Sequence, residues 1–393
     1  MRSISKIVLI AILINITNCN QKPKYYHQDI EPYVGFIKEQ NTRAKDYILD
    51  LFDDHDIVII GERFHPELTQ YELILEIAKD PRFIDSVGNI FIEVCSRNQE
   101  SNVHEYLTSK HLNEKQADSL LLHINRNNSV HPITIRYNFP FFFKGLRTLN
   151  NELENNNKIR LYPSDVPIHW SQITAEKYRT FWDNTISKRD SLMADYTIRK
   201  FDSIENSSGT RKKALVIQNY RHAFGHQFMY PNNEKPDNVG RFLFEAYPGR
   251  VANVLLNTIT WDENENYTPV SDGKWDAAFK VTGVDNIGFD FRGSPFGADY
   301  FDLWPWEKHN FNYTDVFNGY VQYKQVEDFK MVNGIENLID STFLAEVRRR
   351  KELVKTARNL NGIITDSLIW DYNNVKVSPV SDSIEIKINK WIK

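Results

Sequence analysis

Short apolar runs, each followed by polar residues, recur along the chain. Five of them have the length and character of buried strands: Ile57–Ile60, Ile90–Val94, Ile159–Tyr162, Ala214–Ile217 and Val251–Leu256. Runs of this kind, in which apolar and polar positions do not alternate strictly, are typical of strands that are buried on both faces of a parallel sheet.

Segments with helical spacing lie between these runs. One helical face after Pro66 carries Leu68, Tyr71, Leu75 and Ala78. A second face of this kind, which precedes the run at Ile159, carries Leu146, Leu149 and Leu153. The alternation of buried strands with helices predicts an α/β fold with a mostly parallel central sheet that is flanked by helices.

Two longer stretches depart from this alternation. The segment from Thr174 to Ile204 has a long helical pattern, so we expect a helical insertion at about residues 174–205. The segment from Asp262 to Asn310 is rich in Gly, Asp, Pro and aromatic residues, and we expect mainly loops there. Residues 46–393 as a whole are expected to form a single α/β domain with this insertion.

The N-terminus reads "MRSISKIVLIAILINITNC", with two basic residues, an apolar run from Ile7 to Ile16, and then Cys19. The run is too short to span a bilayer and fits the apolar region of a signal peptide. The residues "ITNC" resemble a bacterial lipobox with Cys19 as the acylated residue; the alternative is an ordinary cleaved signal peptide. We expect a signal peptide at 1–18, a tether and N-terminal segment at 19–45, and a lipid-anchored bacterial protein secreted across the inner membrane that faces the periplasm or the cell surface.

The composition of the chain limits the classes of binding partner that we expect. The chain has 393 residues, of which 41% are hydrophobic and 25% charged, and its net charge is −4. No basic patch stands out, so we expect neither nucleic-acid binding nor a membrane contact beyond the lipid anchor. The only cysteines are Cys19 and Cys95. If Cys19 is acylated, no disulfide is possible, and a cysteine-based metal site is excluded.

Four polar residues stand where predicted strands end. Glu62 and His65 follow the first run in "IVIIGERFHPE", Glu93 ends the second in "IFIEV", and His222 follows "ALVIQNY". In open parallel sheets, ligands bind beyond the carboxyl ends of the strands. If these strands are neighbours, the two carboxylates and two imidazoles converge on one crevice. They are suited to acid–base work on a water molecule, or to a divalent metal held by His65, Glu93 and His222.

Each of these residues also has a structural interpretation. A carboxylate in a buried strand needs a partner or a task, and Glu93 has three candidate ion-pair partners: Arg63, Arg97 and Arg221. His65 is also suited to capping the N-terminus of a helix, and His222 to a hydrogen-bonded position in the core. His226, one helical turn after His222, is a further candidate cleft residue. The histidines at positions 104, 111, 123 and 131 lie outside strand ends, and we expect them to be structural or exposed.

Several common catalytic motifs are missing from the sequence. It contains no P-loop, no dinucleotide-binding glycine fingerprint and no G-x-S-x-G nucleophile elbow. Cys95 adjoins an apolar strand rather than a base, so it lacks the features of a nucleophile. Water activated by glutamate and histidine is therefore the leading chemistry, for which no cofactor is expected; a divalent metal or haem stays possible.

The segments "IVIIGERFHPE", "IFIEV", "RDSLMADYTI" and "ALVIQNYRHAFG" together resemble the erythromycin esterase-like superfamily. That superfamily is similar to the ChaN-type haem-binding lipoproteins and, more distantly, to the TraB and Tiki proteins. The resemblance covers roughly Asp56 to Tyr323. It implies an α/β core with a helical subdomain or lid beside the strand-end cleft, and the esterase branch requires no metal.

The resemblance also implies roles for the cleft residues. His65 would be the general base on water, and Glu62 or Glu93 would orient and charge-stabilise it. His222 would hold the developing oxyanion or protonate the leaving group. Arg189, from the "RDSLMA" helix, is a possible cleft residue, with an ion pair to a neighbouring acid as its structural alternative.

The sequence departs from the esterase pattern in both turns. Arg63, Phe64 and Pro66 stand where esterases have small residues and a glycine, and Tyr220 and Arg221 replace small residues before the second histidine. A macrolide substrate is therefore not supported. We expect a hydrolase that acts on an ester or related bond of an unknown small molecule.

Two alternatives to the esterase stay open. One is a non-enzymatic haem- or metal-binding lipoprotein of ChaN type, and the other is a metal-dependent peptidase of TraB/Tiki type. A haem site needs an axial tyrosine or histidine on an exposed apolar surface. "RYNFPFFF", from Arg136 to Phe143, supplies Tyr137 and several aromatics. Such a run is more typical of a core or lid segment.

Overall fold

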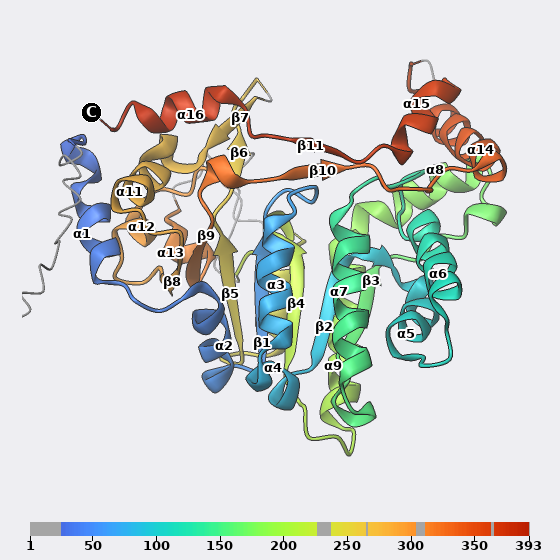
Figure 1. The fold of residues 1–393 in the computed structure, drawn as a ribbon, viewed down its shortest axis with the longest axis horizontal. Coiled ribbons are helices and arrows are strands. Elements are labelled where there is room, and N and C mark those ends of the chain that lie inside the picture. The colour runs from blue at the N-terminus through green and yellow to red at the C-terminus, as the bar shows by residue number, and fades with distance from the viewer. Residues whose placement is uncertain (1–24, 226–236, 265, 304–310, 363–364, 393) are drawn as a thin grey trace, which may run out of the picture.

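The computed structural model describes residues 25–225, 237–264, 266–303, 311–362 and 365–392. Its centre is a seven-stranded sheet in the order β3-β2-β4-β1-β5-β9-β8 (Figure 1). In this order the strands are Arg160–Asp165, Asn89–Ser96, Ala214–Asn219, Ile57–Glu62, Val251–Leu256, Gly319–Tyr323 and Asn286–Asp290. The first six strands run parallel, and β8 is antiparallel to β9. The predicted α/β fold with a mostly parallel sheet is confirmed.

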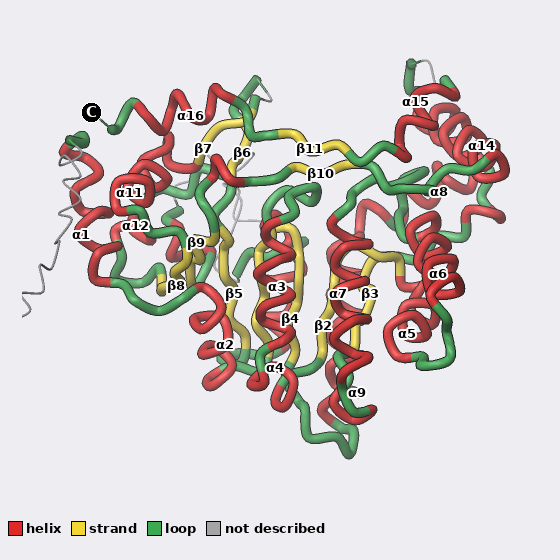
Figure 2. The backbone as a smooth tube through the Cα atoms, in the orientation of Figure 1, coloured by secondary structure: helices red, strands yellow, loops and turns green. Residues whose placement is uncertain are grey.

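The central strands are buried on both faces because their side chains enter two separate cores. In β1, Ile57 and Ile59 belong to one core, whereas Val58 and Ile60 belong to the other. Fully burying such a side chain stabilises the fold by about 1.5–3 kcal/mol, so a strand without a polar face belongs at the centre of a three-layer protein. Figure 2 shows the strands as this central layer.

Helices cover both faces of the sheet. The core that contains Val58 is covered by α2 (Ala44–Asp54), α3 (Thr69–Lys79), α5 (Glu100–Thr108), α6 (Glu114–Asn127) and α7 (Asn138–Glu152). The core that contains Ile57 is covered by α1 (Glu31–Glu39), α9 (Arg189–Glu205), α10 (Val239–Ala246) and α11 (Lys274–Thr282). The shorter elements are α4 (Pro81–Ser86), α12 (Pro295–Ala298), α13 (Tyr313–Val316), α16 (Asp382–Asn389), β6 (Ile259–Trp261) and β7 (Tyr267–Pro269).

A helical subdomain stands beside the carboxyl ends of the strands. Helices α8 (Ala175–Asn184) and α14 (Ser341–Arg358) pack together there, with α15 (Asp366–Trp370) against α14. A two-stranded ribbon, β10 (Met331–Asn333) with β11 (Lys376–Ser378), joins this subdomain to the rest of the chain and passes over the strand ends (Figure 1). The stretch 174–205 therefore splits, because α8 packs in the subdomain while α9 packs on the sheet.

Two expectations need correction. The folded part begins before residue 46, because Ile30, Val34 and Ile37 of the N-terminal segment are fully buried in the core. The segment 262–310 is also not mainly loop, since it contains α11 and the edge strand β8. Both elements are short; α11 contains an aspartate and β8 a glycine and an aspartate, so neither shows a clear apolar face in the sequence alone.

Some predictions concern residues outside the described ranges. The signal peptide, the lipidation site Cys19 and the cleft candidate His226 all lie there. Among the helices of the described residues, none is both long and apolar enough to cross a bilayer.

Candidate functional site

The turn after β1 presents Glu62 and His65 together. Glu62, the last residue of β1, is 1% exposed, and one of its carboxylate oxygens is hydrogen-bonded to Nδ1 of His65. The hydroxyl of Tyr71 on α3 donates to the other oxygen, at 2.7 Å. Both oxygens are thereby fixed, and Nε2 of His65 is left facing Glu93, whose Oε1 is 3.7 Å away.

Arg63 stabilises the same turn. Its side chain is buried and does not line the cavity. Its backbone N–H donates to Oε1 of Gln70 at 2.7 Å, and its guanidinium donates to Glu67 at 2.8 Å and to the carbonyl of Asn257 at 2.5 Å. Arg63 is therefore the partner of Glu67 and not of Glu93. The bulky residue that departs from the esterase pattern holds the turn in shape, which preorganises Glu62 and His65.

Glu93 stands at the centre of the cluster. Its carboxylate, 2% exposed, accepts the backbone N–H of Asn219 at 2.8 Å and two guanidinium contacts from Arg189 at 3.2 Å. Burial raises the pKa of Glu93, but His222, His65 and Arg189 outweigh it and hold the pKa well below its ordinary value. The pairing of β2 with β3 is irregular between Ile92 and Ser96, as is common beside active sites.

His222 approaches Glu93 from the end of β4. It ends the short helical turn Tyr220–His222, where its Nδ1 lies 2.8 Å from Oδ2 of Asp190 and its Nε2 lies 3.6 Å from Oε1 of Glu93. Burial lowers the pKa of His222, but Asp190 and Glu93 together raise it above the ordinary value. The imidazolium form of this ring is therefore favoured, in contrast to a histidine in an apolar core.

Arg189, the first residue of α9, is part of the cluster and contacts two acids. Its Nε donates to Oδ1 of Asp165 at 2.6 Å, and its two terminal nitrogens reach Glu93. Burial lowers the pKa of Arg189, but Asp165 and Glu93 outweigh it and raise the pKa above its ordinary value. Its ion-pair partners are thus Asp165 and Glu93, while the adjacent Asp190 serves His222.

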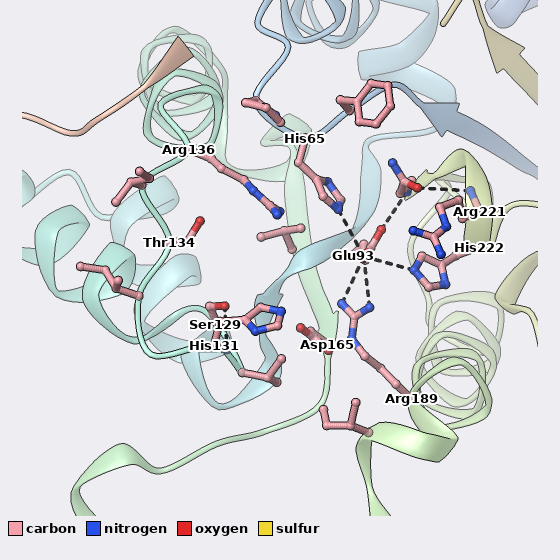
Figure 3. A pocket seen from close by; sticks show the side chains of 18 of the residues that line it. His65, Glu93, Ser129, His131, Thr134, Arg136, Asp165, Arg189, Arg221 and His222 are labelled. Atoms are coloured by element: carbon pink, nitrogen blue, oxygen red, sulfur yellow. Dashed lines mark hydrogen bonds and ion pairs between the residues drawn. The ribbon is translucent and has the colours of Figure 1, made fainter. Parts of the chain in front are cut away.

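The side chains of His65, Glu93, Asp165, Arg189 and His222 line one cavity of about 690 Å³, which is a typical size for a small-molecule site. Figure 3 shows His65, Arg189 and His222 converging on Glu93 from different sides. The opposite wall comes from the loop 129–136, from the subdomain and from β10; it includes Val130, His131, Ile133, Arg136, Trp182 and Asn333. Phe64 and Trp261 form an aromatic edge, with ring centroids 4.3 Å apart.

No protein-family profile and no curated protein sequence matches the chain. Three solved structures are similar to it. One is a Bacillus cereus protein, with 13% identity and a TM-score of 0.44 over 77% of this chain and 99% of that one. Another is a type III effector, with 11% identity and a TM-score of 0.34 over 57% of this chain and 90% of that one.

The third is an erythromycin esterase. The structure is of a mutant in its open conformation, with 12% identity and a TM-score of 0.44 over 75% of this chain and 96% of that one. At such identities and TM-scores none of the three likenesses carries an inference about function. The chemistry of this chain is therefore argued from its own residues.

The structure brings Glu62, His65, Glu93, His222 and Arg189 together, as the strand-end argument and the resemblance require. Among the residues that contact the cluster or the cavity, sequence reasoning missed Asp165, Asp190, Asn219 and Arg136. Asp165 ends β3 just as Glu93 lies near the end of β2, so the same strand-end rule applies to it. His131 is exposed, as its sequence context predicted, and it also lines the cavity.

The side chains around the cavity bear on the metal and haem alternatives. Ligand atoms of Glu62, His65 and Glu93 lie within 4.8 Å of one another, so these residues can hold an ion. In the aromatic run that follows Arg136, Phe139, Phe142 and Phe143 are 0% exposed and belong to the core that α7 covers. Tyr137 and Phe141 are half-buried and line a separate cavity of about 390 Å³, so the run is only in part a core segment.

Proposed function

We propose that this protein is a hydrolase that cleaves an ester or related bond of a small molecule with a histidine-activated water. One observation carries the proposal. Two imidazoles are each held at Nδ1 by a carboxylate, and each directs Nε2 to the same oxygen of Glu93 at the cavity wall. Two imidazoles that are fixed side by side in this way are suited to act as the base and the acid of one reaction.

His65 is the base in this scheme. With Glu62 accepting from Nδ1–H, the lone pair on Nε2 is free to take a proton from a water molecule in the cavity. The water oxygen then bonds to the carbonyl carbon of the substrate. Glu62 stabilises the imidazolium that forms, and the hydroxyl of Tyr71 keeps the carboxylate in place.

His222 is the acid. Its raised pKa favours the form that is protonated at Nε2, which can donate a hydrogen bond to the oxyanion and then a proton to the departing alkoxide. Glu93 stays ionised and holds the site's charge balance between His222 and Arg189. The products are an acid and an alcohol, and both histidines return to their starting protonation states by exchange with solvent.

The test is hydrolysis of 4-nitrophenyl esters by the purified full chain. Replacing His65 with alanine is expected to reduce turnover by about 10²–10⁴-fold, the usual contribution of a positioned base, while the circular dichroism spectrum is unchanged. His104→Ala is the matched control, because His104 is exposed on α5 and does not line the cavity. Retained turnover in His65→Ala, or no turnover of any ester by the wild type, contradicts the proposal.

A metal-dependent peptidase or metal-binding protein is the second candidate, and the same anchored imidazoles favour it. Metal-ligating histidines commonly donate their other ring N–H to a carboxylate. His65 and Glu93 would hold the ion together with Glu62, whose ligand atoms lie within 4.8 Å of theirs, and the ion when bound would lower the pKa of a coordinated water. Against this, the guanidinium of Arg189 already contacts the same oxygen of Glu93. Elemental analysis decides: stoichiometric metal together with loss of activity in chelator favours the second candidate.

A further inference from the structure

Arg136 projects into the cavity from the wall opposite His222 (Figure 3). Its backbone is held in place by the ribbon that passes over the strand ends. Arg136 forms an isolated antiparallel bridge with Asn333 of β10, and the carbonyl of the preceding Ile135 accepts the N–H of Gly334 at 2.6 Å. The side chain therefore starts from a fixed position, as residues that bind a ligand require.

The guanidinium of Arg136 has no hydrogen-bond or ion-pair partner among the described residues, although it is only partly exposed. Burial lowers the pKa of Arg136, while the negative charges of Glu93 and Glu62 raise it. Two other arginines near the site do have ion-pair partners: Arg63 is paired with Glu67, and Arg189 is paired with Asp165 and Glu93.

An arginine remains charged at every physiological pH, and a partly desolvated guanidinium without acceptors is unfavourable. Its five N–H donors form a planar fork that matches a carboxylate or a phosphate. The cavity between Arg136 and the catalytic cluster is also lined by Phe64, Trp182 and Trp261, which offer apolar contacts to a ligand body. A molecule with an anionic group at one end and a scissile bond at the other fits both ends.

We propose that Arg136 binds an anionic group of the substrate, a carboxylate or a phosphate, while the scissile bond lies at His65 and His222. The proposal rests on the hydrolase function and names its substrate class. Arg136 acts as a specificity residue, because it selects which ester is held at the catalytic cluster.

Binding can be measured without turnover, so its outcome is separate from that of the hydrolase proposal. Calorimetric titration of the full chain with 4-nitrobenzoate and with neutral 4-nitrobenzamide compares two ligands of the same shape. The wild type is expected to bind the carboxylate at least tenfold more tightly, and Arg136→Gln is expected to lose this preference. Arg199→Gln is the control, since Arg199 is exposed, pairs with Asp195 and lies outside the cavity lining.

Titration with 4-nitrophenyl phosphate extends the comparison to the other anion, and the tighter of the two anions identifies the group that Arg136 selects. Equal affinity for the benzoate and the benzamide in the wild type overturns the proposal. So does a preference that survives in Arg136→Gln, or the absence of binding by either anion at millimolar concentration.

Kinetics supply a second readout. The ratio of kcat/KM for mono-4-nitrophenyl glutarate, an anionic ester, to that for neutral 4-nitrophenyl acetate is expected to fall at least tenfold in Arg136→Gln. Arg136→Lys keeps the charge but loses the fork, and we expect an intermediate ratio. An equal loss on both esters leaves the ratio unchanged and overturns the assignment of Arg136 to specificity.

Discussion

Replacing Arg63 with methionine tests how the turn between Glu62 and His65 is held. Methionine keeps an unbranched apolar stem but removes every donor. The wild-type guanidinium donates to Glu67, to Thr69, to both oxygens of Asn257 and to the carbonyl of Tyr323. It also lies 3.9 Å above the ring of Phe329 and is 1% exposed.

The magnitude follows from what the substitution leaves behind. Glu67 is 0% exposed and loses its counter-charge, although the backbone N–H groups of Thr69, Gln70 and Lys330 still donate to it. The two backbone carbonyls lose a donor, at about 1–3 kcal/mol for each buried acceptor left unpaired. Removing one partner of a buried ion pair typically costs about 3–5 kcal/mol. The broken ion pair alone sets a lower bound, so we expect the free energy of unfolding to fall by at least about 3 kcal/mol.

The assay is urea unfolding of the wild type, Arg63→Met, Glu67→Gln and the double variant. The double-mutant cycle isolates the coupling between the two side chains, which we expect to exceed about 1 kcal/mol because the pair is buried. Arg199→Met is the surface control and should change stability by less than about 0.5 kcal/mol, since its ion pair is exposed. A loss below about 1 kcal/mol in Arg63→Met, with zero coupling, would refute the claim that this pair holds the turn.

Two further predictions concern titrating groups. Asp190 raises the pKa of His222. The Asp190→Asn variant should therefore move the alkaline limb of the pH profile of kcat/KM to lower pH, because the acid then loses its proton at a lower pH. An alkaline limb that does not move means that His222 is not the acid. Asp276 is buried in α11, and desolvation together with Glu327 raises its pKa to about 8. Its native state keeps a proton that the unfolded state releases, so stability falls as pH rises from about 4 to about 8. Asp276→Asn should therefore be more stable than the wild type at pH 9, with a difference that vanishes near pH 4 in denaturant unfolding; equal stabilities at pH 9 contradict this.

The strands and their shared site followed from the sequence because two strong physical signals coincided. The apolar runs had no polar face, and this pattern places a strand at the middle of a three-layer fold. Once the strands are parallel neighbours, residues at their carboxyl ends must meet, which brought Glu62, Glu93 and His222 into one cleft. Asp165 was not predicted as a site residue because Pro163 and Ser164 suggested that its strand ends earlier. Both residues are in fact buried within β3.

Other features could not be read from the chain because tertiary packing decides them. Arg63 was one of three candidate partners for Glu93, but its guanidinium pairs with Glu67 instead. Arg136 belongs to a loop whose place depends on β10, nearly two hundred residues later, so no local pattern marks it as a cavity residue. The edge strand β8 is short and contains a glycine, and its pairing with β9 rather than its own sequence makes it a strand.

The claim at the centre of this account is that His65 takes the proton from the attacking water. Chemical rescue of His65→Gly by free imidazole tests it most directly, because His65 lines the cavity and its removal leaves room for the added ring. We predict that the variant loses about 10²–10⁴-fold in the hydrolysis of 4-nitrophenyl acetate, and that imidazole restores part of this rate in a saturable manner above its rate without enzyme. Wild-type turnover by His65→Gly in the absence of imidazole would contradict the account.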